Sequence, residues 1–179
     1  MSELKGTRTE KNLMTALNGE ALAHLKYLYY ASQAKKDGYV QIQDIFTETS
    51  KNEKEHAKIW YKLLNDGISP TLENLCEAVG NEQYEWAEMY RDFAEVAESE
   101  GFREISELFR RTAEVERSHE RRYKKLAKRI ESGEVFKRSD DIIWKCQNCG
   151  YLHTGKEAPE VCPLCDHPQA HYRQKENNY

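Results

Sequence analysis

Proline is missing from the first 69 residues, and the whole chain of 179 residues has only four prolines and nine glycines. A stretch so poor in breakers and so rich in Ala, Leu, Glu, Lys and Arg predicts helix almost throughout, as far as about Ile130. No apolar run approaches the roughly 20 residues of a membrane helix. Residues 1–12 also lack the apolar stretch of a secretory signal. We therefore expect a cytoplasmic protein with no membrane partner.

An excess of positive charge is absent as well. The net charge is -4 and the isoelectric point is near 5.9, which argues against nucleic acid as the main partner. Cysteine is scarce, and four of the five cysteines form two Cys-x-x-Cys pairs. In a reducing compartment such pairs indicate metal binding rather than disulfides. The fifth, Cys76, lies in a mostly apolar stretch and is predicted to be a buried core residue.

The few glycines divide the helical region into four segments. Gly38, Gly67, Gly101 and Gly133 are typical helix stops. They predict helices over residues 9–36, 40–65, 82–100 and 102–131. The first two and the last two are joined by short connections, so each pair should form an antiparallel hairpin. The longer segment 68–81 could run the length of a bundle, which predicts an all-α, ferritin-like four-helix bundle with one long crossover.

The two hairpins repeat each other. The second and fourth predicted helices align at an offset of 63 residues, which pairs Glu53 with Glu116 and His56 with His119. Glu20 corresponds to Glu85 once two residues are allowed for in the first hairpin. All these polar residues interrupt apolar stripes. The chain is therefore interpreted as a doubled hairpin, each half bringing one Glu and one Glu-x-x-His.

Carboxylates facing a bundle core need a cation, because an unpaired buried charge costs several kcal/mol or more. Residues three apart share a helix face, so each Glu-x-x-His can reach one centre. A single Glu-x-x-His in so Glu-rich a chain would usually be solvated surface, but two in register predict a dinuclear centre of Fe or Mn. His24 is interpreted as a hydrogen-bonded histidine, and Tyr27 either as core packing or as a partner of a ligand.

The repeat is broken at Glu88, which corresponds to Ala23. Five carboxylates against two Fe(II) leave one negative charge, and exchanging Glu88 for neutral His56 removes it. Oxidation would favour the return of Glu88. This charge balance leads to the hypothesis of a redox-linked ligand exchange between Glu88 and His56.

The region 142–179 follows a polar segment, 134–141, which is interpreted as a linker after a bundle domain of residues 1–133. A segment of this size builds little core without a metal. Its two Cys-x-x-Cys knuckles suit either zinc or a single iron. The ligands would be the four paired cysteines: Cys146, Cys149, Cys162 and Cys165. Neighbouring aromatics such as Trp144 and Tyr151 favour an iron electron carrier.

Several motifs together resemble the rubrerythrin family over essentially the whole chain. They are Gly19-Glu20, Glu53-Lys-Glu-His56, Tyr84-Glu85-Trp-Ala-Glu88-Met89-Tyr90, Glu116-Arg-Ser-His119, Cys146-x-x-Cys149-Gly150-Tyr151 and Cys162-Pro163-Leu164-Cys165. The resemblance implies a ferritin-like bundle with a rubredoxin-like tail, iron at both sites, and a homodimer in which the tail of one subunit serves its partner. The implied bundle ligands are Glu20, Glu53, Glu85, Glu88, Glu116 and His119, with His56 replacing Glu88 upon reduction. Arg91, where the family often has proline, departs from the pattern.

The resemblance also implies an activity. A di-iron site with an oxo and carboxylate bridge would reduce hydrogen peroxide to water, in defence against oxidative stress. Electrons would return through the four-cysteine iron, ultimately from NAD(P)H. Since the chain has no nucleotide-binding glycine motif, the reductase, or a rubredoxin acting as donor, must be a separate protein. Two alternatives remain: a ferroxidase that consumes iron as substrate, and a tail that binds zinc structurally.

Overall fold

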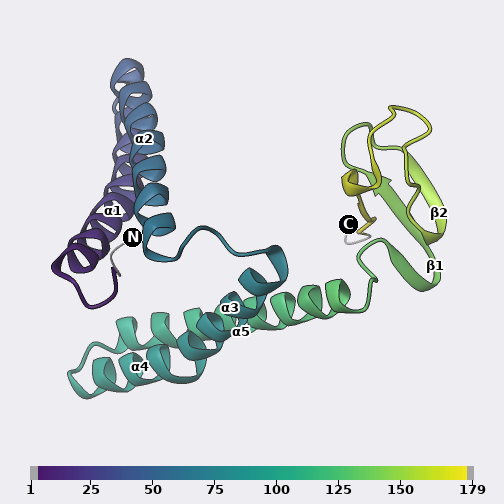
Figure 1. Cartoon of the computed structure of the whole chain (residues 1–179). Helices are drawn as coiled ribbons and strands as arrows, with labels where there is room; N and C mark the ends of the chain where they lie inside the picture. Colours follow the sequence, from purple (N-terminus) through teal and green to yellow (C-terminus); the bar gives the residue numbers. More distant parts are fainter. Residues whose placement is uncertain (1–3, 177–179) are drawn as a thin grey trace. The chain divides into compact units, whose positions relative to one another are not determined.

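The computed structural model describes residues 4–176, and the chain divides into two compact units, Met1–Ser69 and Pro70–Tyr179 (Figure 1). The predicted boundary after residue 133 does not coincide with this division. The two helices of the first unit contact mainly each other, whereas the second hairpin belongs to the same unit as the tail. Residues 1–3 and 177–179 of the predicted domains lie outside the described residues.

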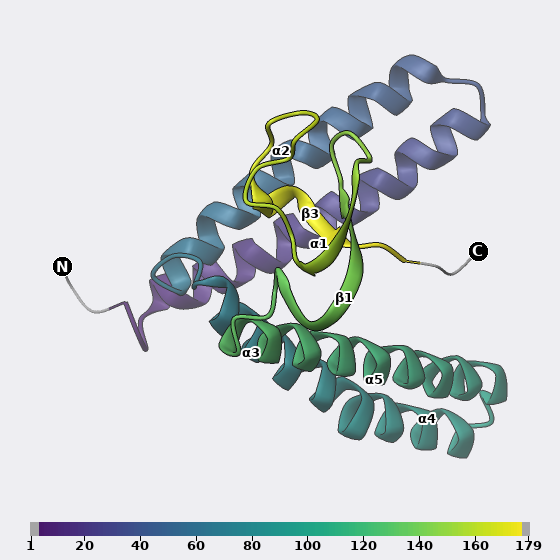
Figure 2. The same ribbon diagram turned by 90° about the vertical axis from the view of Figure 1, so that its right-hand side faces the viewer.

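The first unit is one helical hairpin. Its helices are α1 (Arg8–Lys36) and α2 (Val40–Leu64), which agree with the predicted segments to within one residue at each end. Figure 2 shows them side by side along their length. The Thr7 hydroxyl caps α1 by accepting a hydrogen bond of 3.1 Å from the backbone N–H of Glu10. Gly38 has a φ of +84°, which a turn between the helices requires.

The second hairpin begins earlier than predicted. Helix α3 (Thr71–Tyr84) starts directly after Pro70, continues through a π-helical turn, η1 (Glu85–Met89), and ends as α4 (Tyr90–Ser99). The predicted start of this helix at residue 82 is therefore wrong, since residues 71–81 of the segment expected to cross the bundle are already helical. Pro70 favours the start of a helix rather than a loop, and Gly80 is tolerated within α3 at a cost of about 1 kcal/mol.

Helix α5 (Arg103–Glu131) packs against α3 and α4, completing four long helical segments as predicted. Apart from Glu120, the buried side chains of the helices are small: Ala31, Ala34, Ser50, Ala94, Ala97, Ser106 and Ala127. Small residues allow close helix approach, and the Ser106 hydroxyl donates a hydrogen bond of 2.8 Å to the Ala94 carbonyl. Many large apolar side chains, among them Ile45 and Leu108, stay exposed.

Cys76 is exposed on α3, so its predicted burial is wrong. The apolar neighbours used for that prediction are at most half-buried in the described unit. The packing of α3 against α5 therefore leaves the Cys76 side chain uncovered within this unit.

The tail is a small three-stranded antiparallel sheet of strand order β2-β1-β3. Its strands are β1 (Lys137–Cys146), β2 (Leu152–Glu157) and β3 (Tyr172–Gln174), with a 3₁₀ turn, η2 (Gln169–His171), before β3. The predicted linker 134–141 is shorter than expected, since β1 starts at Lys137, which pairs with Glu157. The tail core comprises five buried residues: Trp144, Cys146, Ala158, Cys162 and Tyr172.

The fold class predicted from the sequence is confirmed at the level of a mostly helical protein with a small strand domain that carries four cysteines. Among the described residues, no helix combines the length and the apolar character needed to cross a membrane.

Candidate metal centres

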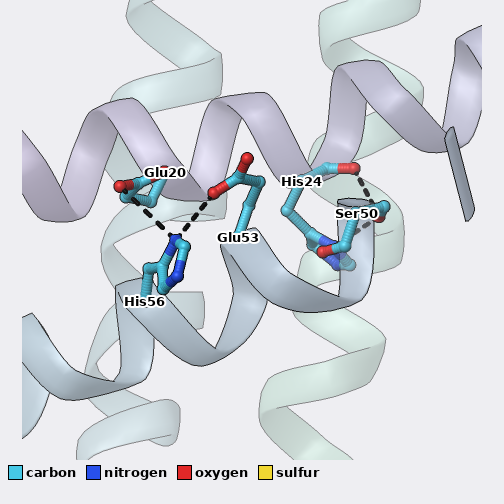
Figure 3. A network of polar contacts seen from close by, with 5 residues as sticks. All are labelled: Glu20, His24, Ser50, Glu53 and His56. Carbon is cyan, nitrogen blue, oxygen red and sulfur yellow. Dashed lines mark hydrogen bonds and ion pairs between the residues drawn. The ribbon is translucent and has the colours of Figure 1, made fainter. Parts of the chain in front are cut away.

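The first hairpin brings Glu20, Glu53 and His56 together, as predicted. Their potential ligand atoms all lie within 4.8 Å of one another. The His56 Nδ1 is 2.8 Å from Glu53 Oε2 and 3.8 Å from Glu20 Oε1. In Figure 3 the three side chains converge in the space between α1 and α2. Two carboxylates and one imidazole in this arrangement can bind a divalent metal ion such as iron.

The second hairpin forms a matching group with one unexpected member. Glu116 and His119 are joined by Glu82, again with ligand atoms within 4.8 Å. The His119 Nδ1 is 2.7 Å from Glu116 Oε2 and 3.4 Å from Glu82 Oε2. Glu85 and Glu88 do not belong to this group. Glu85 lies close enough to Glu82 to raise its pKa, while Glu88 is exposed. Their assignment as iron ligands stays a prediction.

The π-helical turn explains why Glu82 was missed. A π-turn inserts one extra residue into a helix, so it changes the repeat offset by one. After the turn, Tyr90 corresponds to Tyr27 at the offset of 63; before it, Glu82 corresponds to Glu20 at 62. Sequence periodicity assumes 3.6 residues per turn and hides such an insertion. The signal available beforehand was the spacing: Glu82 precedes Glu116 by 34 residues, and Glu20 precedes Glu53 by 33.

Each group contains two carboxyls close enough to affect each other's ionisation. A hydrogen bond with Glu53, together with burial, raises the pKa of Glu20. Burial and a hydrogen bond with Glu116 raise the pKa of Glu82. Ionising two neighbouring carboxyls together costs free energy unless a cation lies between them. The donor sets therefore fit metal ions, whose charge would favour the ionised carboxylates.

Aromatic triads flank both groups and follow the same repeat. Tyr27, Tyr30 and Phe46 contact one another with ring centroids 5.5–6.2 Å apart. Tyr90, Phe93 and Phe109 do so at 5.6–6.3 Å. Of the two interpretations of Tyr27, packing is the one that these ring contacts support. Burial, together with Glu85 and Glu116, raises the pKa of Tyr90, which places its hydroxyl near the second group.

His24 is hydrogen-bonded rather than grouped with the ligands, as predicted. Its Nδ1 is 2.8 Å from the Ser50 hydroxyl, which donates a second bond of 2.9 Å to the His24 carbonyl. In Figure 3 this pair lies beside the Glu20 group and points away from it. His24 thus joins α1 to α2 without contributing to the site.

The four cysteines of the tail also converge. Their sulfurs lie within 4.8 Å of one another, with Cys146 and Cys165 at 3.8 Å and Cys149 and Cys162 at 3.6 Å. A tetrahedral ion with bonds of about 2.3 Å has ligand sulfurs about 3.8 Å apart. The spacing therefore fits one tetrahedral metal ion.

The two knuckles are built alike. In each knuckle, the residue after the second cysteine donates a backbone hydrogen bond of 2.9 Å to the carbonyl of the first cysteine. The donors are Gly150, to Cys146, and Asp166, to Cys162. Both residues have positive φ, +80° and +55°. This turn directs backbone N–H groups towards the sulfurs. Although burial opposes ionisation, hydrogen bonds that include the backbone N–H of Leu164 lower the pKa of Cys162 to about 6. A thiolate is the form that binds metal.

Comparison with known proteins fits both sites. The rubrerythrin family model matches residues 11–127, and a model of the rubrerythrin rubredoxin-like domain matches residues 144–173. Rubrerythrin from Porphyromonas gingivalis is 46% identical over 98% of this chain and 94% of its own. Rubrerythrin from Nitratidesulfovibrio vulgaris is 46% identical over 96% of each chain. This chain belongs to the rubrerythrin family.

More distant relatives also match nearly the whole chain. A putative rubrerythrin from Methanocaldococcus jannaschii is 41% identical over 96% of this chain and 94% of its own. A solved structure titled as the fully reduced, all-ferrous state of nigerythrin is 29% identical and covers 98% of this chain and 92% of that chain. Its TM-score is 0.37, so it gives the fold no support.

Membership of the rubrerythrin family implies a di-iron carboxylate site in the helices and one iron held by the four cysteines. The donor chemistry agrees with this: carboxylate and imidazole in the hairpins, and four thiolates at tetrahedral spacing in the tail. The cofactors expected from the sequence are therefore confirmed at the level of the family: two Fe in the helical site and one Fe at the four cysteines of each chain. The protein is an oxidoreductase of this family.

Proposed function

We propose that the protein is a peroxidase that reduces hydrogen peroxide to water and draws its electrons through the four-cysteine iron. The observation that carries the proposal is the presence, in one chain, of two Glu-Glu-His groups and a four-thiolate group. The reaction needs two electrons and two protons per peroxide to give two molecules of water. Two ferrous ions supply two electrons, and a one-electron thiolate-bound iron can restore them one at a time.

The chain's own residues bind and orient the metals. The carboxyl pairs, Glu20 with Glu53 and Glu82 with Glu116, would hold the metal ions in ionised form, and protons bound in the metal-free state would be released to water. His56 is half-exposed, with a side-chain exposure of 50% against 34% for His119. A less buried imidazole can leave or enter a ligand position more easily. This difference supports the hypothesis that His56 is the residue that exchanges with Glu88.

We further propose a homodimer. Each hairpin, considered by itself, leaves large apolar side chains exposed, which in water need to be covered. They include Leu22, Leu25, Ile45 and Ile59 on the first hairpin, and Phe93, Val96, Ile105 and Leu108 on the second. A second copy of the chain would cover them symmetrically. Sedimentation of the iron-loaded protein as a monomer at micromolar concentration would contradict this.

The test is anaerobic stopped-flow absorption. The protein is reduced until the thiolate-to-iron colour of the tail is bleached, and hydrogen peroxide is then added. Recovery of the colour within seconds, with about one peroxide consumed per two electrons, supports the peroxidase. Slow recovery with peroxide, but rapid uptake of added Fe(II) in air, indicates a ferroxidase instead. A colourless tail that contains zinc rejects the internal electron route.

The electron donor is tested separately. We propose a separate NAD(P)H-dependent reductase, acting directly or through a rubredoxin. Steady NADH consumption on addition of peroxide, only when such a reductase is present, is the expected result. Consumption that continues after the tail iron is removed would show that the donor bypasses it.

A further inference from the structure

The side chain of Trp86 lies against the turn of α5 that also carries two of the second group's ligands. Trp86 is part of the π-helical turn η1. Its indole Nε1 donates a hydrogen bond of 3.0 Å to Glu120 Oε2. The Arg117 guanidinium stacks on the same indole, 5.1 Å from its centroid. Arg117 and Glu120 directly follow Glu116 and His119, so one turn of α5 holds the indole and presents the ligands.

Glu120 is a buried carboxylate that accepts two side-chain hydrogen bonds. It is 5% exposed, the only acidic residue among the buried side chains of the described chain. Besides the indole it accepts a hydrogen bond from the Lys124 ammonium. Such a buried carboxylate is kept only when its hydrogen bonds compensate for lost solvation. The Lys124 ammonium and the indole N–H both favour the ionised form, so their hydrogen bonds are charge-assisted and strong.

The first hairpin offers an internal comparison. At the offset of 63, Glu120 corresponds to Ala57 and Glu88 to Leu25, and α1 is a continuous α-helix with no π-turn. The π-turn, the additional carboxylate Glu88 and the Trp86–Glu120 bond therefore occur together in one hairpin and are all missing from the other. The hydrogen bond and the cation–π contact of Trp86 tie this π-turn to α5, and such turns are frequent at functional sites.

We propose that the Trp86–Glu120 hydrogen bond is a positioning contact that fixes the π-turn in register with α5, and so sets where Glu85 and Glu88 stand relative to Glu116 and His119. The inference rests on the proposed peroxidase function for its kinetic consequence, but not for its structural one. Neither Trp86 nor Glu120 belongs to a group of potential metal ligands among the described residues. They act through the helix turn that carries the two glutamates.

The decisive variant is Trp86→Phe, which keeps an aromatic ring under Arg117 and removes the N–H donor. Its matched control is Trp60→Phe on α2, because the buried Trp60 Nε1 has no hydrogen-bond partner among the described residues. A second pair is Glu120→Gln against Glu107→Gln, whose glutamate forms an exposed ion pair of 2.9 Å with Arg111. Loss of supporting hydrogen bonds around metal ligands typically costs 10- to 100-fold in affinity or activity.

Two measurements separate positioning from stability. The first is amide hydrogen exchange of peptides covering residues 85–90 in the full-length iron-loaded protein. We expect Trp86→Phe to raise their exchange about 10-fold, with Trp60→Phe unchanged. The second is the Mössbauer spectrum of the ⁵⁷Fe-loaded protein. Altered di-iron quadrupole doublets, with an unaltered tail iron, are expected for Trp86→Phe alone.

The kinetic arm is reoxidation of the reduced protein by peroxide. Trp86→Phe should slow it about 10-fold at full iron content, and the double variant with Glu120→Gln should be no slower than the slower single variant. Exchange, spectra and rate all within twofold of Trp60→Phe would overturn the positioning role. Should Glu120→Gln not fold, the tryptophan pair alone decides the matter. A wild-type protein that peroxide fails to reoxidise counts against the proposed function, while the exchange and Mössbauer results still judge the positioning contact.

Discussion

Glu82 Oε2 lies 3.4 Å from His119 Nδ1, across the second hairpin. No hydrogen-bond partner satisfies this buried oxygen among the described residues. An oxygen that is buried, acidic and otherwise unpaired is a strong candidate for a metal ligand, because a bound cation would compensate for its lost solvation.

Replacing Glu82 by Gln is therefore expected to weaken iron binding in the second group by at least about 10-fold, since one charged ligand is lost. Iron per chain, measured by mass spectrometry of metals after dialysis, should fall from three towards two. Glu77→Gln on the exposed side of the same helix is the control and should keep full iron. Full iron in Glu82→Gln, with loss in Glu85→Gln, would instead support the ligand predicted from the sequence.

The sequence predicted most members of the two helical groups because they recur with the repeat. Glu53, His56, Glu116 and His119 lie on α-helices of uniform geometry, so residues three apart share a face and the offset of 63 holds. Glu82 was not predicted because the π-turn changes the repeat offset by one residue within one continuous helix. Such a turn leaves little trace in hydrophobic periodicity, since its effect is a shift of one residue.

Two predictions from local sequence patterns were wrong because tertiary packing determines the features that they concern. Ser69-Pro70 was interpreted as part of a long loop, although proline at a helix start is equally well accommodated. Cys76 was predicted to be buried from apolar neighbours, but which face of a short helix is covered depends on the partner helix. The tail cysteines were predictable because two Cys-x-x-Cys pairs can hardly be satisfied except together.

The carboxyl pairs give the metal-free protein a specific pH dependence. The folded-state pKa values of Glu20 and Glu82 are raised, so the folded state binds more protons than the unfolded state above their ordinary pKa of about 4.3. Stability of the metal-free protein should then fall as pH rises through the raised values. We expect a higher melting temperature at about pH 5.5 than at about pH 7.5 after iron is chelated.

Two comparisons check this assignment. The Glu20→Gln, Glu82→Gln double variant should lose much of the difference between the two pH values, because neutral amides do not titrate. Iron-loaded wild-type protein should show a smaller difference, because a bound metal ion keeps these carboxyls ionised at both pH values. An equal dependence in the metal-free wild type and the double variant would assign it to other groups.

The His24–Ser50 contact predicts a stability effect separate from activity. Ser50 is fully buried, and its hydroxyl both contacts His24 Nδ1 and donates to the His24 carbonyl. Ser50→Ala removes both contacts of the hydroxyl, while His24 Nδ1 keeps the Ser50 backbone carbonyl at 2.9 Å. The loss of two hydrogen bonds should cost about 1–3 kcal/mol, or about 2–12 °C in melting temperature for a chain of this size. Peroxide reduction at 25 °C should be unchanged.

Thr49→Ala is the control for that experiment. The Thr49 hydroxyl donates only to the Ile45 carbonyl within its own helix, at the surface, so its loss should shift the melting temperature by less than about 2 °C. Equal shifts for the two variants would show that the interhelical bonds add no stability. Loss of peroxide reduction in Ser50→Ala would give His24 a role in the site that its orientation does not indicate.

The tail offers a matched pair of cysteines, one inside the four-sulfur group and one outside it. Cys165 has its sulfur 3.8 Å from that of Cys146, whereas Cys76 is exposed on α3 and belongs to no group of potential ligands among the described residues. Cys165→Ser replaces a thiolate by a poorer ligand, and a buried core of five residues cannot hold so small a sheet without its metal. In Cys165→Ser the visible colour should be lost and the tail amides should exchange freely. Cys76→Ser should keep the colour and the slow exchange of the tail amides.

If the tail is the electron inlet, Cys165→Ser should also slow NADH-driven peroxide reduction at least about 100-fold. A single reoxidation of the chemically reduced helical site should continue at the wild-type rate, because that step draws only on electrons already stored there. Equal loss of both rates would mean that the four-cysteine iron supports the structure of the di-iron site rather than supplying its electrons.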